Sequence, residues 1–232
     1  MSSNHLKRLA MPRSWPLPRK TSVWVTRPTP GAHSLELCMP ITLVVRDVLN
    51  MAKTAREVRF ILHNELAKID GRVVKDTRRG VGLMDVLTLG EDNYRCVLDH
   101  NGRLQYRPIS AEEAAWKVCR IEGKTTIKGG RTQLNLHDGR NIIVDDPSEY
   151  NTGDSLKLNL PGQTIIEHIR FGEGTRCYLI GGAHAGSTAS VKEYIVKRSS
   201  MPNAVQFDDF GTVARNVFAI GDASMPLTEV AE

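Results

Sequence analysis

The sequence predicts an α+β protein of several domains. Three observations support this prediction: the length of 232 residues exceeds what one small core needs, the first forty residues combine prolines with cations, and turn signals recur from residue 90 onward. The predicted parts are an extended basic N-terminal arm over residues 1–40, an α-rich module over 41–89, a central mainly-β domain over 90–170 and a C-terminal β domain over 171–232.

The N-terminal arm carries positive charge only. Residues 1–30 contain no Asp or Glu, and five prolines between residues 12 and 30 block helix continuation. A free segment of this composition is expected to be disordered and to order on a polyanion, where Trp15 and Trp24 would have something to pack on. Its cations are Lys7, Arg8, Arg13, Arg19, Lys20 and Arg27.

The module over residues 41–89 is expected to fold as two helices and a hairpin. Residues 41–49 are typical of a short apolar helix, and Thr54-Ala55-Arg56-Glu57 is a capping box that begins a second one. The pair Asp70-Gly71 indicates a hairpin turn. Helical spacing predicts that one face is buried through Val58, Ile61, Leu62 and Leu66.

The other face of this module is basic. The second helix and the hairpin after it share one sign of charge with the arm before them, which favours a surface for a polyanion over an ordinary solvated face. The net charge of +5 and the pI of about 9.1 agree with such a partner without requiring it. The cations and histidine of the module are Lys53, Arg56, Arg59, His63, Arg72, Lys75, Arg78 and Arg79.

The rest of the chain is expected to be β-rich. Turn pairs stand at residues 101–102, 129–130 and 138–139, and a helix over residues 111–119 is predicted from the capping box that Ser110 opens. The end of the chain is acidic, because its last thirty residues contain one cation, Arg215, and five acidic residues: Asp208, Asp209, Asp222, Glu229 and Glu232. The expected strands are residues 141–144, 164–171, 177–180, 191–196, 204–207 and 217–220.

Two fragments imitate cofactor motifs. The run GGAHAGST at 181–188 has P-loop glycine spacing, but Ser187 stands at the lysine position and a strand is expected to follow, so we interpret it as a turn between strands. The run NVFAIGDA at 216–223 is similar to a flavin-contacting stretch, yet the chain lacks the GxGxxG turn that such enzymes need. No nucleotide or flavin cofactor is therefore expected.

No metal site, catalytic site or small-molecule substrate is predicted. The four cysteines form no CxxC pair, and the seven histidines show no metal-binding spacing. The chain has no apolar run of membrane-spanning length and no signal peptide, so the cytoplasm is the expected location and no membrane partner is expected.

The order of several motifs resembles the S4e family of ribosomal proteins, found in the small subunit of archaea and eukaryotes. The similar stretches cover nearly the whole chain and keep the order of the family. They are HLKRLAMPRSW at residues 5–15, RPTPGAH at 27–33, RDVL at 46–49, AKT at 52–54, IDGRV at 69–73, VGLMDV at 81–86 and LNLHDGRN at 134–141. The length of the chain resembles that of the archaeal members.

This resemblance implies an S4-type RNA-binding module over residues 41–89 and a KOW element over residues 177–196 in an SH3-like C-terminal domain. Ser187-Thr188-Ala189-Ser190 departs from the family's usual lysine and weakens one phosphate contact of that element. Apart from Arg27, the cations of the arm and the module are, together with His63, the expected RNA-binding residues, and the resemblance adds others in the arm, the module and the glycine turn. These are His5, Trp15, Arg46, Gly181, Gly182, His184 and Gly186.

The function that the resemblance implies is architectural. The chain is expected to be a structural constituent of the cytoplasmic small ribosomal subunit, to bind and stabilise ribosomal RNA, and to contact neighbouring ribosomal proteins, without catalysis. Two other classes remain open. An RNA-modifying enzyme would need a catalytic motif within residues 90–232, and a free RNA-binding regulator would not sediment with small subunits.

Overall fold

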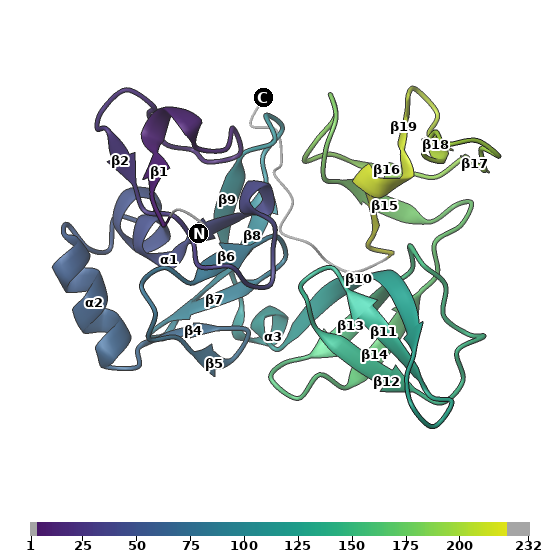
Figure 1. The fold of residues 1–232 in the computed structure, drawn as a ribbon, viewed down its shortest axis with the longest axis horizontal. Coiled ribbons are helices and arrows are strands. Elements are labelled where there is room, and N and C mark those ends of the chain that lie inside the picture. Colours follow the sequence, from purple (N-terminus) through teal and green to yellow (C-terminus); the bar gives the residue numbers. More distant parts are fainter. Residues whose placement is uncertain (1–3, 222–232) are drawn as a thin grey trace. The chain divides into compact units, whose positions relative to one another are not determined.

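The computed structural model describes residues 4–221 and is mostly β (Figure 1). The chain forms two compact units. Unit 1 comprises Met1–Leu98 and Arg103–Lys117, and unit 2 comprises Asp99–Gly102 and Val118–Glu232. The fold is thus mixed, as expected: the longer helices lie within residues 41–89, and strands make up most of the regular structure elsewhere.

Unit 1 is built on a five-stranded antiparallel sheet. The expected domain boundary at residue 89 differs from the structure, because Val86 pairs with Arg95 and the sheet continues into two further strands. Hydrogen bonding between neighbouring strands sets this boundary. The spacing of apolar residues in the helices gives no information about which later strands join the sheet. In spatial order the strands are β5 (Arg72–Val73), β4 (Ala67–Ile69), β7 (Val86–Leu89), β8 (Asp92–Leu98) and β9 (Leu104–Ile109).

The helix expected over residues 41–49 is confirmed. It begins as α1 (Ile41–Leu43) and continues without a break as the π-helical turn η3 (Val44–Val48). Ile41, Leu43 and Val44 are all buried, so this short helix is held by packing rather than by its own length.

The second helix, α2 (Ala55–His63), begins at the expected capping box. The Thr54 hydroxyl oxygen accepts a hydrogen bond from the Glu57 N–H at 3.2 Å, and the Glu57 carboxylate accepts one from the Thr54 N–H at 3.4 Å. Val58 and Leu62 are fully buried, and Ile61 is half-buried.

The prediction that Leu66 is buried was wrong, since its side chain is 48% exposed. The helix ends at His63, and Glu65 has a positive φ of 58°, so the chain turns before Leu66 and that residue no longer continues the buried face.

The segment expected to be a free arm is a packed part of unit 1. Strands β1 (Leu6–Lys7) and β2 (Trp24–Val25) pair with each other, next to the 3-10 turn η1 (Arg8–Ala10). Trp15 is only 2% exposed, and its Nε1 donates a hydrogen bond to the Cys38 carbonyl at 2.8 Å. The burial of this indole, with Met11 and Val25, supplies the core that proline content and charge did not predict.

Two further segments complete the description of the N-terminal region. The 3-10 turn η2 (Leu35–Leu37) leads into β3 (Cys38–Pro40), which pairs with β6 (Gly80–Gly82). A Cβ added at Gly82 would overlap the His33 ring, so glycine is needed there for the close approach of that side chain.

A cluster of charges lies in the interior of unit 1. Lys117 is fully buried, and its Nζ lies 3.0 Å from Asp70 Oδ2 and 2.6 Å from Asp85 Oδ1. His33 Nε2 lies 2.9 Å from the same Asp85 oxygen. Burial opposes ionisation of Asp85, but His33 and Lys117 outweigh it and hold the pKa of this carboxyl well below its ordinary value.

The helix expected over residues 111–119 is much shorter in the structure. Helix α3 (Ala111–Ala114) does begin at the Ser110 capping box, but it stops there, and β10 (Trp116–Thr126) follows. Cys119 and Ile121 on this strand pack with Leu134 and Leu156 in the core of unit 2. Burial between neighbouring strands therefore overrides the local helix signal.

Unit 2 contains a second five-stranded sheet and two small three-stranded sheets. Each of the six strands expected from sequence has a counterpart in this unit. The order of the large sheet is β12 (Asn141–Val144), β11 (Thr132–Leu136), β10, β13 (Ser155–Asn159) and β14 (Ile165–Ile169).

The strands of one small sheet of unit 2 are inserted in sequence between strands of the other, and the 3-10 turn η4 (Ala214–Asn216) links the last strand of the inserted sheet to the last strand of the other. Asp222, Glu229 and Glu232 of the acidic end lie outside the described residues. Among residues 4–221, no helix is both long and apolar enough to cross a membrane. One small sheet has the order β16 (Thr188–Ser190), β15 (Arg176–Leu179), β20 (Val217–Ala219), and the other β17 (Glu193–Ile195), β18 (Ala204–Gln206), β19 (Gly211–Val213).

Candidate RNA-binding surface

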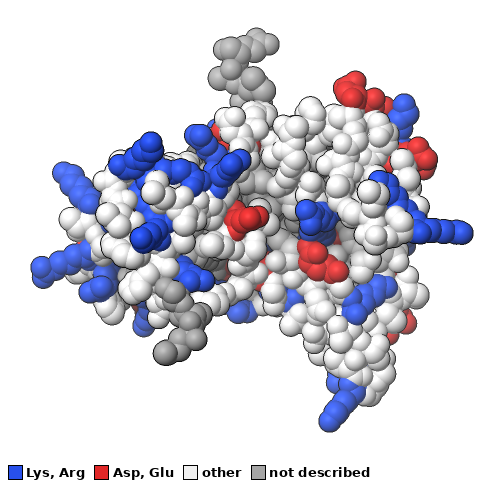
Figure 2. All heavy atoms as spheres, turned by 45° about the horizontal axis from the view of Figure 1, so that its top comes forward, with Lys and Arg blue, Asp and Glu red and all other residues white. Residues whose placement is uncertain are grey.

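Positive charge is concentrated in unit 1. Its sequence contains 19 Lys and Arg against 11 Asp and Glu, a formal balance of +8, whereas unit 2 has 12 against 15, a balance of −3. Figure 2 shows Lys and Arg side chains gathered over the surface of unit 1, with few Asp and Glu between them. A polyanion is therefore attracted to unit 1 rather than to the whole chain.

The exposed face of α2 carries cations and one aromatic ring. Arg56, Arg59, Phe60 and His63 are all exposed and recur at the three- and four-residue spacing of one helix face, opposite the buried Val58 and Leu62. The Phe60 side chain is 67% exposed, so its ring is accessible beside these cations. Lys53, just before the helix, is exposed as well.

The basic residues after α2 fall into two groups. Arg72, Lys75 and Arg79 are exposed, although the Lys75 Nζ lies 2.7 Å from Glu65 Oε1. Arg78 is half-buried, and its Nε donates to the Arg27 carbonyl at 3.0 Å, which ties the N-terminal segment to the loop before β6.

The expected residues of the N-terminal segment also differ in exposure. Lys7, Arg13 and Lys20 are exposed, and Arg19 is half-buried with a hydrogen bond to the Leu9 carbonyl. Trp15 lies in the core, so it is not exposed for the base stacking expected of it.

Arg8 is buried and already has protein partners. Its Nε donates to the Pro18 carbonyl at 2.6 Å, and its Nη1 donates to the Ser22 hydroxyl at 3.2 Å. These bonds fold the N-terminal segment back on itself, so a structural role for Arg8 accompanies any contact it makes with a ligand.

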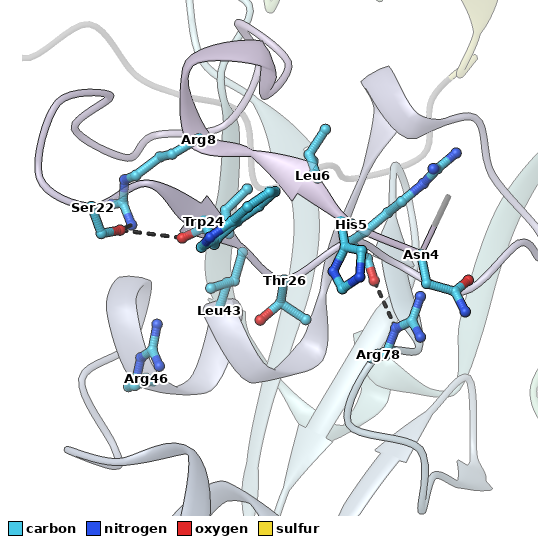
Figure 3. Close-up of a pocket in the computed structure, with 12 residues that line it drawn as sticks. Asn4, His5, Leu6, Arg8, Ser22, Trp24, Thr26, Leu43, Arg46 and Arg78 are labelled. Atoms are coloured by element: carbon cyan, nitrogen blue, oxygen red, sulfur yellow. Dashed lines mark hydrogen bonds between the residues drawn. The ribbon is translucent and has the colours of Figure 1, made fainter. Parts of the chain in front are cut away.

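A groove of about 540 Å³ opens between the N-terminal segment, α1 and the loop before β6 (Figure 3). No Asp or Glu is among the described residues that line it. Arg46 is held by its neighbour Asp47 through two hydrogen bonds of 2.8 Å, and these also keep the pKa of Arg46 raised. The cationic and aromatic residues of the lining are His5, Arg8, Trp24, Arg27, Arg46 and Arg78.

Trp24 is the aromatic residue of this groove that the expected RNA-binding set left out. It is 56% exposed, and the Lys7 Nζ lies 5.8 Å from the centre of its ring. The His5 ring lies 5.7 Å away and tilted by 55°. The run Val23-Trp24-Val25 is apolar throughout and Val23 is exposed as well, so no alternation in the sequence separates the exposed Trp24 from the buried Trp15.

The glycine turn at residues 181–186 belongs to unit 2 and joins β15 to β16. Because a strand follows it, the turn does not open a helix, as the sequence predicted. The exposed His184 stacks on Phe210 with ring centres 4.1 Å apart, while Gly186 is buried and Gly181 and Gly182 lie beside Asn216. The chain before Phe210 carries Asp208 and Asp209, both exposed, which disfavours a phosphate at this turn.

Three possible metal ligands lie close together in unit 2. One ligand atom from each of Cys119, His137 and Asp138 falls within 4.8 Å of the others. However, Arg140 Nε lies 3.0 Å from Asp138 Oδ2, the His137 Nδ1 accepts the Arg120 N–H at 3.2 Å, and the Cys119 thiol donates to Asp138. These contacts stabilise the turn after β11, and the guanidinium already neutralises the carboxylate that a cation would need.

The buried cysteines elsewhere favour the neutral thiol. Burial raises the pKa of the Cys177 thiol to about 12, and burial, aided by the nearby Asp85 carboxylate, raises that of Cys38 to about 11. A thiol that stays protonated near neutral pH is a poor nucleophile and a poor metal ligand, so packing is the role that fits both residues.

Comparison with known proteins identifies the family of this fold. The profile described as "Ribosomal family S4e" matches residues 90–165, and the RS4NT domain profile matches residues 2–36. The chain is 43% identical to the small ribosomal subunit protein eS4 of Methanothermobacter thermautotrophicus, over 95% of this chain and 93% of that protein. It is 44% identical to the eS4 protein of Methanocaldococcus jannaschii, over 94% of each chain.

A solved structure shows the same fold. The crystal structure of the 30S ribosomal protein S4e from Thermoplasma acidophilum superposes with a TM-score of 0.71 and is 32% identical in sequence. The match covers 80% of this chain and 95% of that one. Because identity above 40% extends over nearly the full length of archaeal relatives and the fold agrees, the chain belongs to the S4e family of ribosomal proteins.

Proposed function

We propose that this chain is a structural constituent of the small ribosomal subunit in the cytoplasm, where it binds and stabilises ribosomal RNA and so supports translation without catalysis. The observation that carries the proposal is the charge of unit 1, which has a balance of +8 and exposes cations on α2 and around the Trp24 groove. Ribosomal RNA exposes phosphates and shallow grooves that proteins contact through such surfaces. The printed names of the relatives, small ribosomal subunit protein eS4, support the same assignment.

The RNA contacts are proposed to divide among the parts of the chain. Residues 41–89 act as the S4-type module, in which α2 and the β4–β5 hairpin turn their cations to the RNA. Residues 1–40 add Lys7, Arg13 and Lys20, which are exposed. This segment packs within unit 1, so it is proposed to bind as part of a preformed surface rather than as a strand that orders on contact.

The C-terminal part of the chain is proposed to be an SH3-like domain with a KOW element at residues 177–196. The negative balance of unit 2 and the aspartates before Phe210 favour contacts with neighbouring, basic ribosomal proteins over contacts with phosphate there. His184, fixed against Phe210, is the residue of the glycine turn best placed for such a contact.

Sedimentation of the tagged full-length chain tests this function. A lysate of cells that produce the chain at native level is fractionated on a sucrose gradient at low salt, and each fraction is probed for the tag and for small-subunit RNA. The chain is expected to peak with small subunits and to remain there when unbound proteins are washed away. A chain that stays at the top of the gradient would instead be a free RNA-binding regulator or an enzyme, and the proposal would fail.

A further inference from the structure

We propose that the Trp24 groove holds one unpaired nucleotide of the bound RNA, with its base stacked on the Trp24 ring and its phosphates beside the arginines of the groove. This inference rests on the proposed function, since it names the part of an RNA that one site of unit 1 takes. It concerns a residue outside the expected RNA-binding set.

The first argument is the aromatic platform. An indole that is 56% exposed keeps more than half of its surface accessible and offers a face for a base. The backbone that carries the ring is also held in place, because β1 sets Lys7 directly opposite Trp24 and the Ser22 hydroxyl donates to the Trp24 carbonyl at 3.2 Å. Figure 3 shows Trp24 and His5 at the same groove, and with ring centres 5.7 Å apart the His5 ring lies against the indole and supports it.

The second argument is the charge around this platform. Arg8 and Arg78 each donate through Nε to a backbone carbonyl, of Pro18 and Arg27 respectively, which fixes their orientation before any ligand arrives. Figure 3 shows Arg46 and Arg78 on either side of Thr26 and Leu43, below the rings. Arg8 is buried and also donates through Nη1 to Ser22, and Arg46 already pairs with Asp47. Arg78 is therefore the guanidinium best placed to donate to phosphate oxygens, which accept paired hydrogen bonds from such preoriented groups.

The third argument is size and access. A volume of about 540 Å³ falls within the range of roughly 300–1,000 Å³ that is usual for sites that hold small ligands. A base within a duplex already stacks on both neighbours and cannot lie on Trp24. Only a nucleotide from a loop, a bulge or a single strand can place its base on the ring and its phosphates on the arginines.

The test compares single-stranded oligoadenylate with the same strand annealed to oligouridylate, both bound to the full chain. Trp24→Leu removes the aromatic ring but keeps an apolar side chain, and Trp24→Phe keeps a ring and serves as the matched control. Trp24→Leu is expected to weaken oligoadenylate binding by roughly 5- to 150-fold, or about 1–3 kcal/mol, while Trp24→Phe stays close to the original chain. Affinity for the duplex should be the same in all three proteins.

Quenching of tryptophan fluorescence gives a separate sign of stacking. Oligoadenylate should quench the original chain, and the quenching should disappear in Trp24→Phe although binding persists, because Trp15 is buried and the half-buried Trp116 does not line the groove and has Arg95 over its ring. Equal oligoadenylate affinity in Trp24→Leu and the original chain would overturn the inference alone, provided that ribosomal RNA still binds. A chain that binds neither oligonucleotide nor ribosomal RNA would overturn the proposed function as well.

Discussion

Lys117 joins three separate stretches of unit 1 through its charge. Its ammonium lies between the carboxylates of Asp70 and Asp85, and Asp85 in turn contacts His33 from the N-terminal segment. The backbone also uses these carboxylates, because Asp70 accepts the Val86 N–H and Asp85 accepts the Gly82 N–H. Removal of one partner from such a cluster leaves a buried charge without compensation.

Lys117→Ala is therefore expected to lower the free energy of unfolding by about 3–5 kcal/mol, as loss of one partner from a buried ion pair does. Lys75→Ala is the matched control, because the Lys75–Glu65 pair is similarly short but both side chains are more than half exposed. The control is expected to change stability by less than about 1 kcal/mol. Urea unfolding of both variants measures the difference, and equal effects would contradict the account.

The pH dependence of stability follows from Asp85. The pKa of this carboxyl is lower in the folded chain than in the unfolded one, so its contribution is present above the ordinary value of about 4 and is lost as the pH falls through the folded value. The original chain is expected to lose stability in acid more steeply than Asp85→Asn. Urea midpoints measured from neutral pH downward test this, and parallel curves would show that Asp85 contributes nothing to the acid limb.

Residue types alone did not distinguish the two tryptophans of the N-terminal segment. Both stand among cations and prolines, and both were expected to be exposed, yet Trp15 donates to Cys38 within the core while Trp24 lies at the groove. Cys38, which accepts the hydrogen bond of the Trp15 indole, lies 23 residues away in sequence. Burial of this kind depends on tertiary contacts that composition does not reveal.

At the scale of elements, α2 separates folding from binding. Leu62 is fully buried on one face, whereas Arg59 is exposed on the other. Leu62→Ala is expected to destabilise the chain by about 2–5 kcal/mol because it leaves a cavity. Leu66→Ala is the control, because it makes the same substitution at a half-exposed site, and it should lower the free energy of unfolding clearly less. Melting curves of the two variants measure the contrast. A larger loss of stability in Leu66→Ala than in Leu62→Ala would show that the buried face of α2 is wrongly assigned.

Arg59→Ala tests the exposed face of the same helix. It should leave the melting curve nearly unchanged, because an exposed arginine contributes little to folding. Its affinity for small-subunit RNA should fall, since a phosphate contact is lost. If the variant melts early while its RNA affinity holds, Arg59 is structural and the face is wrongly assigned.

Helix beginnings were predictable from sequence, whereas helix ends were not. Thr54 and Ser110 each form the capping box that the sequence indicated, because this signal lies within four residues. The end of α3 depends on the pairing of β10 with distant strands, and the turn before Leu66 depends on the backbone at Glu65. The pattern of apolar residues around each helix end shows neither of these causes.

At the scale of the whole molecule, the division of charge between the units is the main functional feature. Sequence reasoning located the basic residues and the family resemblance, but it placed the first boundary before β8, whose pairing with β7 extends unit 1. It also left out the Trp24 groove, because the groove is formed by segments around residues 5, 24, 46 and 78 that only the fold brings together.

The measurement that tests the central account most directly is the salt dependence of affinity for small-subunit ribosomal RNA. It compares the original chain with two double variants, Arg56→Ala with Arg59→Ala in unit 1 and Lys128→Ala with Arg131→Ala in unit 2, all four residues being exposed. The unit 1 variant is expected to bind more weakly and to lower the slope of log affinity against log salt by about 2. The unit 2 variant should match the original chain. An unchanged slope in the unit 1 variant, or a larger loss in the unit 2 variant, would contradict the account.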